Sequence, residues 1–177
     1  MYEANKLSSL LAVAESSLRE IMYCEKAVVY VVEDDQKSFY KFDEMDEKVV
    51  FPADRGIIGQ CLQTKEVMDI PHTYSHTAYH NSVDLDTELP ILCMPIFSTK
   101  KEGQVLAIIQ VLNLNRIGYL MKSKSDMFEA EVVKIFCNML GICIEKFTRV
   151  KDLMVEKTKN KFLINFYKSR EYAFRRK

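Results

Sequence analysis

The chain has 177 residues, 48% of them hydrophobic and 28% charged, which suits one domain with a buried core. Lys plus Arg and Asp plus Glu number 25 each, so the formal net charge is zero and no basic excess favours nucleic acid as a partner. No apolar run approaches the length of a membrane span, and the N-terminus lacks a signal-like apolar stretch. We therefore expect neither a membrane span nor secretion.

Cysteine usage indicates a reducing compartment. The chain has five cysteines, an odd number, and no CxxC pair. Three of them lie within apolar patterns, where a buried free cysteine behaves as a small hydrophobic residue. A secreted framework of disulfides is therefore not expected, and the sequence predicts a cytoplasmic protein.

The first part of the chain predicts a helix followed by three strands. Apolar residues recur at three- and four-residue spacing over residues 5–22, which is typical of an amphipathic helix. Residues 27–32, AVVYVV, are β-branched and aromatic and predict a buried strand. A polar turn at residues 33–36 leads to a second strand at 38–42, and a third is expected at 48–51.

The middle of the chain predicts a short helix and a long irregular segment. A turn at Asp54-Arg55-Gly56 leads into a helix over residues 57–64. A brief strand at 67–70 ends at Pro71, which cannot continue a strand ladder. Residues 72–89 are polar and rich in aromatic residues and histidine, and we expect them to form a lid over a pocket.

The last part predicts a second hairpin and a long helix. Strands are expected at residues 91–97 and 105–112, joined by a turn at 100–103. An apolar stripe predicts a helix over 126–150, and its pattern can extend as far as residue 164. We therefore expect an α+β domain with a central antiparallel sheet and helices at both ends.

Five short motifs occur in order along the middle of the chain, namely FPAD at 51–54, GIIG at 56–59, Ile70-Pro71, Val83-Asp84 with Thr87, and ILCMPI at 91–96. In this order and spacing the sequence resembles the regulatory GAF modules of cyclic-nucleotide phosphodiesterases, over roughly residues 28–147. GAF and PAS domains both fit the order of elements, and the motifs favour GAF. The resemblance implies terminal helices on one face of the sheet, and a short helix plus lid over the other. It also implies an N-terminal helix at 1–25, a GAF core at 26–150 and a helical extension at 151–177.

The resemblance also implies a set of ligand-binding positions. In cyclic-nucleotide-binding relatives the nucleotide lies over the sheet and under the lid, where an aromatic ring stacks on the base and helix-start N–H groups hold the phosphate. Carried over to this chain, the positions beside the base are Phe42 and Asp43, and those at the helix start are Ile57 and Ile58. The positions in the lid are Tyr79, His80, Asp84 and Thr87, and the position on the strand floor is Gln110.

The lid departs from the family pattern. Two aspartates of the family's lid are replaced here by His72 and His76. The stretch that follows Thr87 is about three residues shorter than in the family and lacks its second threonine, because Thr87 to Pro90 lead directly into the next strand. The shortened lid, together with the change of the family's lysine to Leu114, favours a domain that has lost its ligand.

A second family signature, an Asn-Lys pair followed by spaced Phe, Asp and Glu, is also altered. Asn113 matches it, but Leu114 replaces the lysine, and Ser125 and Glu129 fall at the phenylalanine and the aspartate. The family's Lys–Asp ion pair is therefore excluded, and Arg116 with Asp126 or Glu129 could substitute for it only if the turn relaxes.

The three histidines, His72, His76 and His80, follow at four-residue spacing. On a helix they would share one face, as metal ligands do, whereas Pro71 and an irregular lid favour a solvated loop. We assign no metal site, and a pH response of the lid between about 5 and 7 is the alternative use of these side chains.

No catalytic constellation is evident. A phosphodiesterase active site needs a His/Asp-rich two-metal cluster, which three histidines in one loop do not supply. In free-methionine-sulfoxide reductases, which are GAF enzymes, a cysteine would stand where Ile58 stands here, so Cys61 and Cys93 are interpreted as core residues.

The sequence thus predicts a non-catalytic regulatory GAF domain without a cofactor, whose ligand is a small molecule, with cGMP or cAMP as the first candidates. The alternative is a degenerate GAF domain that acts as a dimerisation or scaffold module. In either case the terminal helices are the expected contacts with a second copy or with neighbouring domains. The basic end, residues 168–177, is interpreted as a solvated tail or as a contact for an acidic partner.

Overall fold

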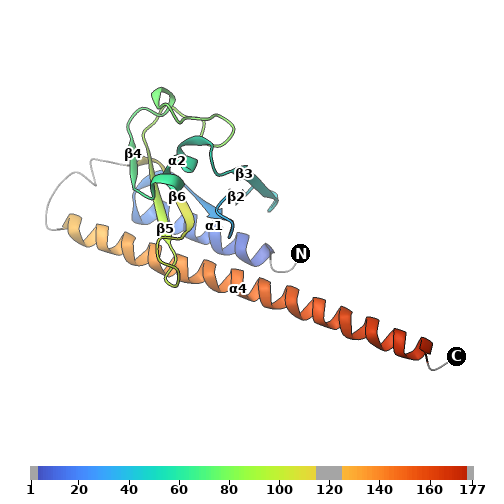
Figure 1. Ribbon diagram of the computed structural model, residues 1–177. Helices are drawn as coiled ribbons and strands as arrows, with labels where there is room; N and C mark the ends of the chain where they lie inside the picture. Colours follow the sequence, from blue (N-terminus) through green and yellow to red (C-terminus); the bar gives the residue numbers. More distant parts are fainter. Residues whose placement is uncertain (1–3, 115–124, 175–177) are drawn as a thin grey trace. The chain divides into compact units, whose positions relative to one another are not determined.

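The computed structural model of the protein (Figure 1) describes residues 4–114 and 125–174, and the side chains of residues 7–112, 131–150 and 152–164. A six-stranded antiparallel sheet has the order β3-β2-β1-β6-β5-β4. Its strands are β1 (Cys24–Val32), β2 (Ser38–Phe42), β3 (Lys48–Pro52), β4 (Met68–Ile70), β5 (Ile91–Phe97) and β6 (Val105–Leu114).

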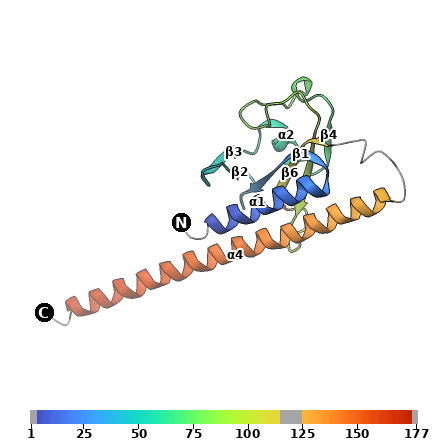
Figure 2. The same cartoon turned by 180° about the vertical axis from the view of Figure 1, so that it is seen from behind.

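Helices cover both faces of this sheet. Helix α1 (Ala4–Ile21) and the part of α4 (Ser125–Phe174) that ends at Ile144 pack on one face, opposite the short helix α2 (Gly56–Thr64), as Figures 1 and 2 show for α1 and α2. The lid, residues 72–89, lies on the α2 side and contains one 3₁₀ turn, η1 (Thr73–Ser75). The predicted α+β fold, with terminal helices on one face and a short helix plus lid on the other, is confirmed.

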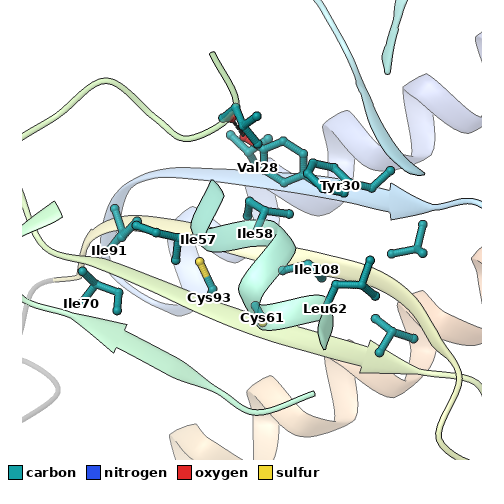
Figure 3. Close-up of a cluster of buried hydrophobic side chains, with 14 of the residues drawn as sticks. Val28, Tyr30, Ile57, Ile58, Cys61, Leu62, Ile70, Ile91, Cys93 and Ile108 are labelled. Carbon is teal, nitrogen blue, oxygen red and sulfur yellow. Dashed lines mark hydrogen bonds between the residues drawn. The ribbon is translucent and has the colours of Figure 1, made fainter. Parts of the chain in front are cut away.

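The two cores follow from the alternation of side chains along the strands. In β6, Ala107, Ile109 and Val111 face the terminal helices, whereas Ile108 and Leu112 face α2. Figure 3 shows the second core, in which α2 side chains such as Ile58 pack onto the strands. This alternation places residue 110, a fully buried glutamine, on the α2 side.

Strand β2 stays close to β1 only at its start. The two strands pair at Val31 with Tyr40 and at Val32 with Phe39. Nearer the start of β1, the amide of Val29 donates to Glu15 Oε1 of helix α1 at 2.8 Å. Helix α1 therefore satisfies a strand donor as well as covering the core.

The pattern of contacts divides the chain into two compact units, residues 1–144 and residues 145–177, and α4 contributes to both. The first unit contains the whole sheet, α1 and α2. Among the described residues, no helix combines the length and the hydrophobicity that crossing a bilayer requires.

We predict that Glu15→Gln raises the free energy of unfolding at neutral pH. Burial raises the pKa of the Glu15 carboxyl, while the Val29 N–H bond, Lys26 and Lys41 oppose the shift. The folded state therefore holds this proton to a higher pH than the unfolded chain does, so stability falls as pH rises above the normal carboxyl range. The amide keeps the acceptor for Val29 without a buried charge.

Chemical denaturation at several pH values measures this effect. The gain in Glu15→Gln should shrink as pH falls towards the normal range of a carboxyl. Glu20→Gln, at an exposed position of the same helix, is the matched control and should leave stability unchanged. A loss of stability in Glu15→Gln at neutral pH would contradict the interpretation.

Candidate functional site

Asp84 closes the start of helix α2. Its side chain is only 5% exposed, and its two carboxylate oxygens each accept the N–H of Ile57 at 3.0 Å. The N–H of Ile58 also points to Oδ1, at 3.4 Å. The first N–H groups of a helix lack partners within the helix and form its positive end, so they attract an anion. Here that anion is a side chain of the lid.

Gly56 makes the close approach of Asp84 possible. Its φ of +76° lies in the left-handed region, and a Cβ atom on it would stand 2.9 Å from Asp84 Oδ2 and 3.0 Å from Val83 Cγ1. Only glycine satisfies both demands without strain.

The same carboxylate holds the lid to the sheet. Oδ2 of Asp84 accepts the N–H of His80 at 2.9 Å, and Oδ1 lies 3.5 Å from Nε2 of Gln110. The carbonyl oxygen of His80 accepts the N–H groups of Val83 and Asp84, which folds residues 80–84 into a tight turn. Lid, helix start and strand floor therefore meet at one buried charge.

Tyr30 completes this polar network from strand β1. Its hydroxyl lies 3.2 Å from the carbonyl oxygen of Val83 and 3.4 Å from Oε1 of Gln110, and its single proton serves one of them at a time. Burial, with the charge of Asp84 as a further cause, raises the pKa of Tyr30. The hydroxyl therefore stays neutral and remains a donor at physiological pH.

The structure brings together five of the positions that the resemblance indicates. Backbone N–H groups of Ile57, Ile58 and His80 converge on Asp84, and the side chain of Gln110 lies beneath it. The side chains of Ile57 and Ile58 are themselves fully buried. The contribution of the helix start is therefore made through its backbone.

Two further positions lie in the lid, away from this charge. The ring of Tyr79 packs edge-on against Tyr74 at 5.2 Å, and both hydroxyls donate to Asp86, at 3.4 Å and 2.8 Å respectively. The hydrogen bond to Asp86 raises the pKa of Tyr74 to about 12. Thr87 Oγ1 accepts the N–H of Leu89 at 3.0 Å and so stabilises the end of the lid.

Phe42 and Asp43 are not brought to the site. Phe42 packs on the face of the sheet that the terminal helices cover, with its ring 5.7 Å from that of Tyr40. The physical reason is that successive side chains of a strand point to opposite faces of the sheet. Phe39 therefore faces α2, and Phe42, three positions later, faces the terminal helices. Asp43 is exposed, and its Oδ1 accepts the N–H groups of Met45 and Glu47 within its own turn.

A surface hollow of about 460 Å³ opens beside the start of α2, at the edge of the lid. The residues that line it are Asp54, Arg55, Gly56, Gln60, Gln63, Thr77, Ala78, Tyr79 and His80. Oε1 of Gln60 is buried and has no hydrogen-bond partner within the described residues. Buried acceptors in proteins are usually paired with a protein group or an ordered water.

Sequence reasoning missed Tyr30 and Gln60. Tyr30 alternates with Val28 and Val32 in β1, which is the signal that it faces the same side as the pocket floor. Gln60 follows Ile57 by three positions on α2, which places it one turn further along that helix.

The lid histidines do not share a helix face. The lid's helical part is only the turn Thr73–Ser75, with His72 before it and His76 after it. His80 Nδ1 lies 2.8 Å from the hydroxyl oxygen of Ser82. Within the part of the chain that the structure describes, no group of three His, Cys, Asp or Glu side chains is placed to hold a metal ion.

The pocket-side cysteines lie in the core. Burial raises the pKa of Cys61 to about 12 and that of Cys93 well above its normal value, so both thiols are protonated at neutral pH. A thiol in this state is a weak nucleophile. The altered signature at Leu114, Ser125 and Glu129 concerns side chains outside the described residues.

We predict that Gly56→Ala destabilises the protein by about 1–3 kcal/mol, because it combines a left-handed backbone with a clash against Asp84. Gly103→Ala is the matched control, since Gly103 has a φ of +69° but only Lys65 Nζ, at 3.6 Å, near the added Cβ. Thermal denaturation of both variants separates the close approach from the backbone cost. An equal loss in the two would contradict the role given to Asp84.

Comparison with known proteins agrees with this fold. The sequence model of the GAF domain family matches residues 6–144. The chain is 27% identical over 127 residues to a cGMP-specific 3',5'-cyclic phosphodiesterase of Drosophila erecta, and 28% identical over 126 residues to that of Drosophila virilis. These matches cover 70% of this chain but only 11% and 13% of the relatives.

Solved structures show the same fold at low sequence identity. The GAF domain of an Acinetobacter phosphoenolpyruvate-protein phosphotransferase is 14% identical with a TM-score of 0.58, and the match covers 85% of this chain and 91% of that one. A type II free methionine-R-sulfoxide reductase of Thermoplasma acidophilum is 15% identical with a TM-score of 0.56, over 82% of this chain and 96% of that one. Identities this low carry the fold alone.

Proposed function

The chain belongs to the GAF domain family, and on that basis we propose that it is a non-catalytic regulatory module that binds a small ligand, with cGMP or cAMP as the first candidates. The observation that carries the proposal is the start of α2, where the N–H groups of Ile57 and Ile58 already hold an anionic group, the Asp84 carboxylate of the lid. The similarity to cGMP-specific phosphodiesterases supports a cyclic nucleotide as the ligand. The protonated core thiols support a role without catalysis.

Ligand binding in this proposal is a competition with Asp84. The phosphate of a cyclic nucleotide is an anion, and it would need the N–H groups that the Asp84 carboxylate already holds. Two negative charges do not share one helix start without a large penalty. A bound nucleotide therefore releases Asp84 and with it the turn at residues 80–84. The lid then takes up a different position only when ligand is present, which is the requirement for a switch.

Two observations favour a second candidate function, a GAF domain that acts as a dimerisation or scaffold module without a ligand. Phe42, which the resemblance places beside the base, faces the terminal helices instead. The described part of α4 within the first unit also exposes Ile135, Met139 and Ile142, by 41–61%. Large apolar residues in such a group are typical of a contact surface. For either function we propose a cytoplasmic location, in line with the five free cysteines.

A thermal shift of the purified chain with cGMP, and separately with cAMP, tests the first function. Ligand at a hundred times its Kd adds about 2.7 kcal/mol to the stability, which is several degrees for a domain of this size. We expect a selective shift with one of the two nucleotides, and 5'-GMP and 5'-AMP serve as controls for non-specific binding. An unchanged melting temperature with both cyclic nucleotides at millimolar concentration would contradict the first function and favour the scaffold function.

We predict that Asp84→Asn separates the two roles of this side chain. The amide keeps the shape but carries no charge, so its hold on the helix start weakens and the free protein loses about 1–3 kcal/mol of stability. With its competitor neutralised, the phosphate of the nucleotide should bind more tightly than in the wild type. Calorimetric titration measures the affinity, and hydrogen exchange of residues 80–84 reports the loosened turn. Asp86→Asn, elsewhere in the lid, is the control, and a weaker affinity in Asp84→Asn would contradict the competition.

A further inference from the structure

The neutral total charge of the chain conceals two strongly charged parts. Residues 145–177 contain eleven Lys or Arg and four Asp or Glu, which gives a formal charge of +7. Residues 1–144 contain fourteen and twenty-one respectively, which gives −7. The division between these parts is the division between the two compact units. The acidic unit of one copy therefore attracts the basic unit of another copy, and units of the same charge repel each other.

The helix of the basic unit presents a surface with apolar and cationic side chains. Every described side chain from Asp152 to Ile164 is exposed. Six residues at three- and four-residue spacing form one face of this helix, namely Leu153, Glu156, Lys157, Asn160, Lys161 and Ile164. Leu153 and Ile164 are 57% and 55% exposed. We call this face the basic stripe. Its exposed apolar residues beside two lysines suit a partner surface with apolar and acidic groups.

The acidic unit carries such a surface at the turn between β2 and β3. Residues 43–47, DEMDE, are all exposed, and four of the five are carboxylates. Met45 in their middle is 84% exposed. The hydrogen bonds of Asp43 Oδ1 to the amides of Met45 and Glu47 hold the turn in shape. The turn thus offers one apolar group within a ring of negative charge.

Charge decides between two ways in which copies of this chain can pair. Two basic units (residues 145–177) laid side by side would bring a formal charge of +7 against +7, which opposes their association. A basic stripe laid on the acidic turn of another copy brings opposite charges together and buries Met45 against apolar residues of the helix. We propose that the basic stripe of one copy binds the turn at residues 43–47 of a second copy. This inference rests on the interaction role proposed above and not on ligand binding.

A charge-swap experiment with the full chain tests the proposal. Variant A carries Glu44→Lys and Glu47→Lys, and variant B carries Lys157→Glu and Lys161→Glu, all at exposed positions. At low salt, light scattering should show wild-type dimers, while A alone and B alone are at least about tenfold weaker. An equimolar mixture of A and B restores both contacts and should dimerise again. Failure of the mixture to dimerise would overturn the proposal.

The direction of the salt effect is a second, independent readout. An attraction between opposite charges weakens when salt is raised from about 0.05 M to about 1 M, where the screening length falls to about 3 Å. Pairing of like-charged helices through apolar residues would strengthen instead, and that result would overturn the proposal. A wild-type chain that stays monomeric at low salt would overturn it as well.

Matched controls keep these outcomes interpretable. Lys159 lies two positions from Lys157 and Lys161, on the other side of the helix, so Lys159→Glu alone should weaken the dimer less than Lys161→Glu alone. Circular dichroism of A and B should match the wild type, because all four side chains are exposed. Their melting temperatures should match the wild type at high salt, where the dimer is dissociated and adds nothing to the stability. A thermal shift with cGMP is measured separately on variant B, so that loss of dimerisation and loss of ligand binding are told apart.

Discussion

The bond between Asp84 and the first amides of α2 is the interaction on which the α2 side of this domain depends. A helix start that enters a core leaves N–H groups without partners, and those groups must be satisfied or the burial is costly. Asp84 satisfies them from a lid that is 27 residues further along the chain. Its own charge is buried, so it is stable only while those donors, together with His80 and Gln110, surround it. The lid and the helix therefore hold each other in place.

This mutual dependence explains several side chains that an isolated motif would leave unexplained. Gln110 is a polar residue at the centre of an apolar strand because it faces the carboxylate and not the core alone. Tyr30 supports the same network from the neighbouring strand. Gly56 is required because any side chain there would occupy the space of the carboxylate. The buried carboxylate of Asp84 therefore constrains which residues can stand at one position each of β1, β6 and α2.

Much of the fold could be read from periodicity, because strands and helices bury alternate or every third and fourth residue. The strand at 27–32, the short helix after Gly56 and the long final helix all occur where the pattern predicted them. The resemblance added the arrangement of the faces. Boundaries were less accurate, since α4 runs to Phe174, beyond the apolar stripe that predicted its end. Packing onto the sheet explains the apolar stripe in the first part of α4, but it does not explain why the helix continues to Phe174.

The candidate site could be predicted only in part, for a physical reason. Spacing along the chain identifies Ile57, Asp84 and Gln110 as candidates, but it carries no information on which of them bond to each other. The partner of the helix start turned out to be within the chain. Phe42 shows a second limit of sequence reasoning. The resemblance identifies the position along the strand, but not the face of the sheet to which its side chain points. In a strand, a difference of one residue moves a side chain to the opposite side of the sheet.

The bond from Val29 to Glu15 gives helix α1 a protective role. Where β2 turns away from β1, the outer edge of a central strand would be open to pairing with any other extended chain. Helix α1 covers that stretch with a carboxylate that takes the strand's own hydrogen bond. A fragment that began at Cys24 would keep all six strands of the sheet and lose this cover. We expect such a fragment to aggregate through the exposed strand edge, while the polar network around Asp84 on the α2 side stays intact.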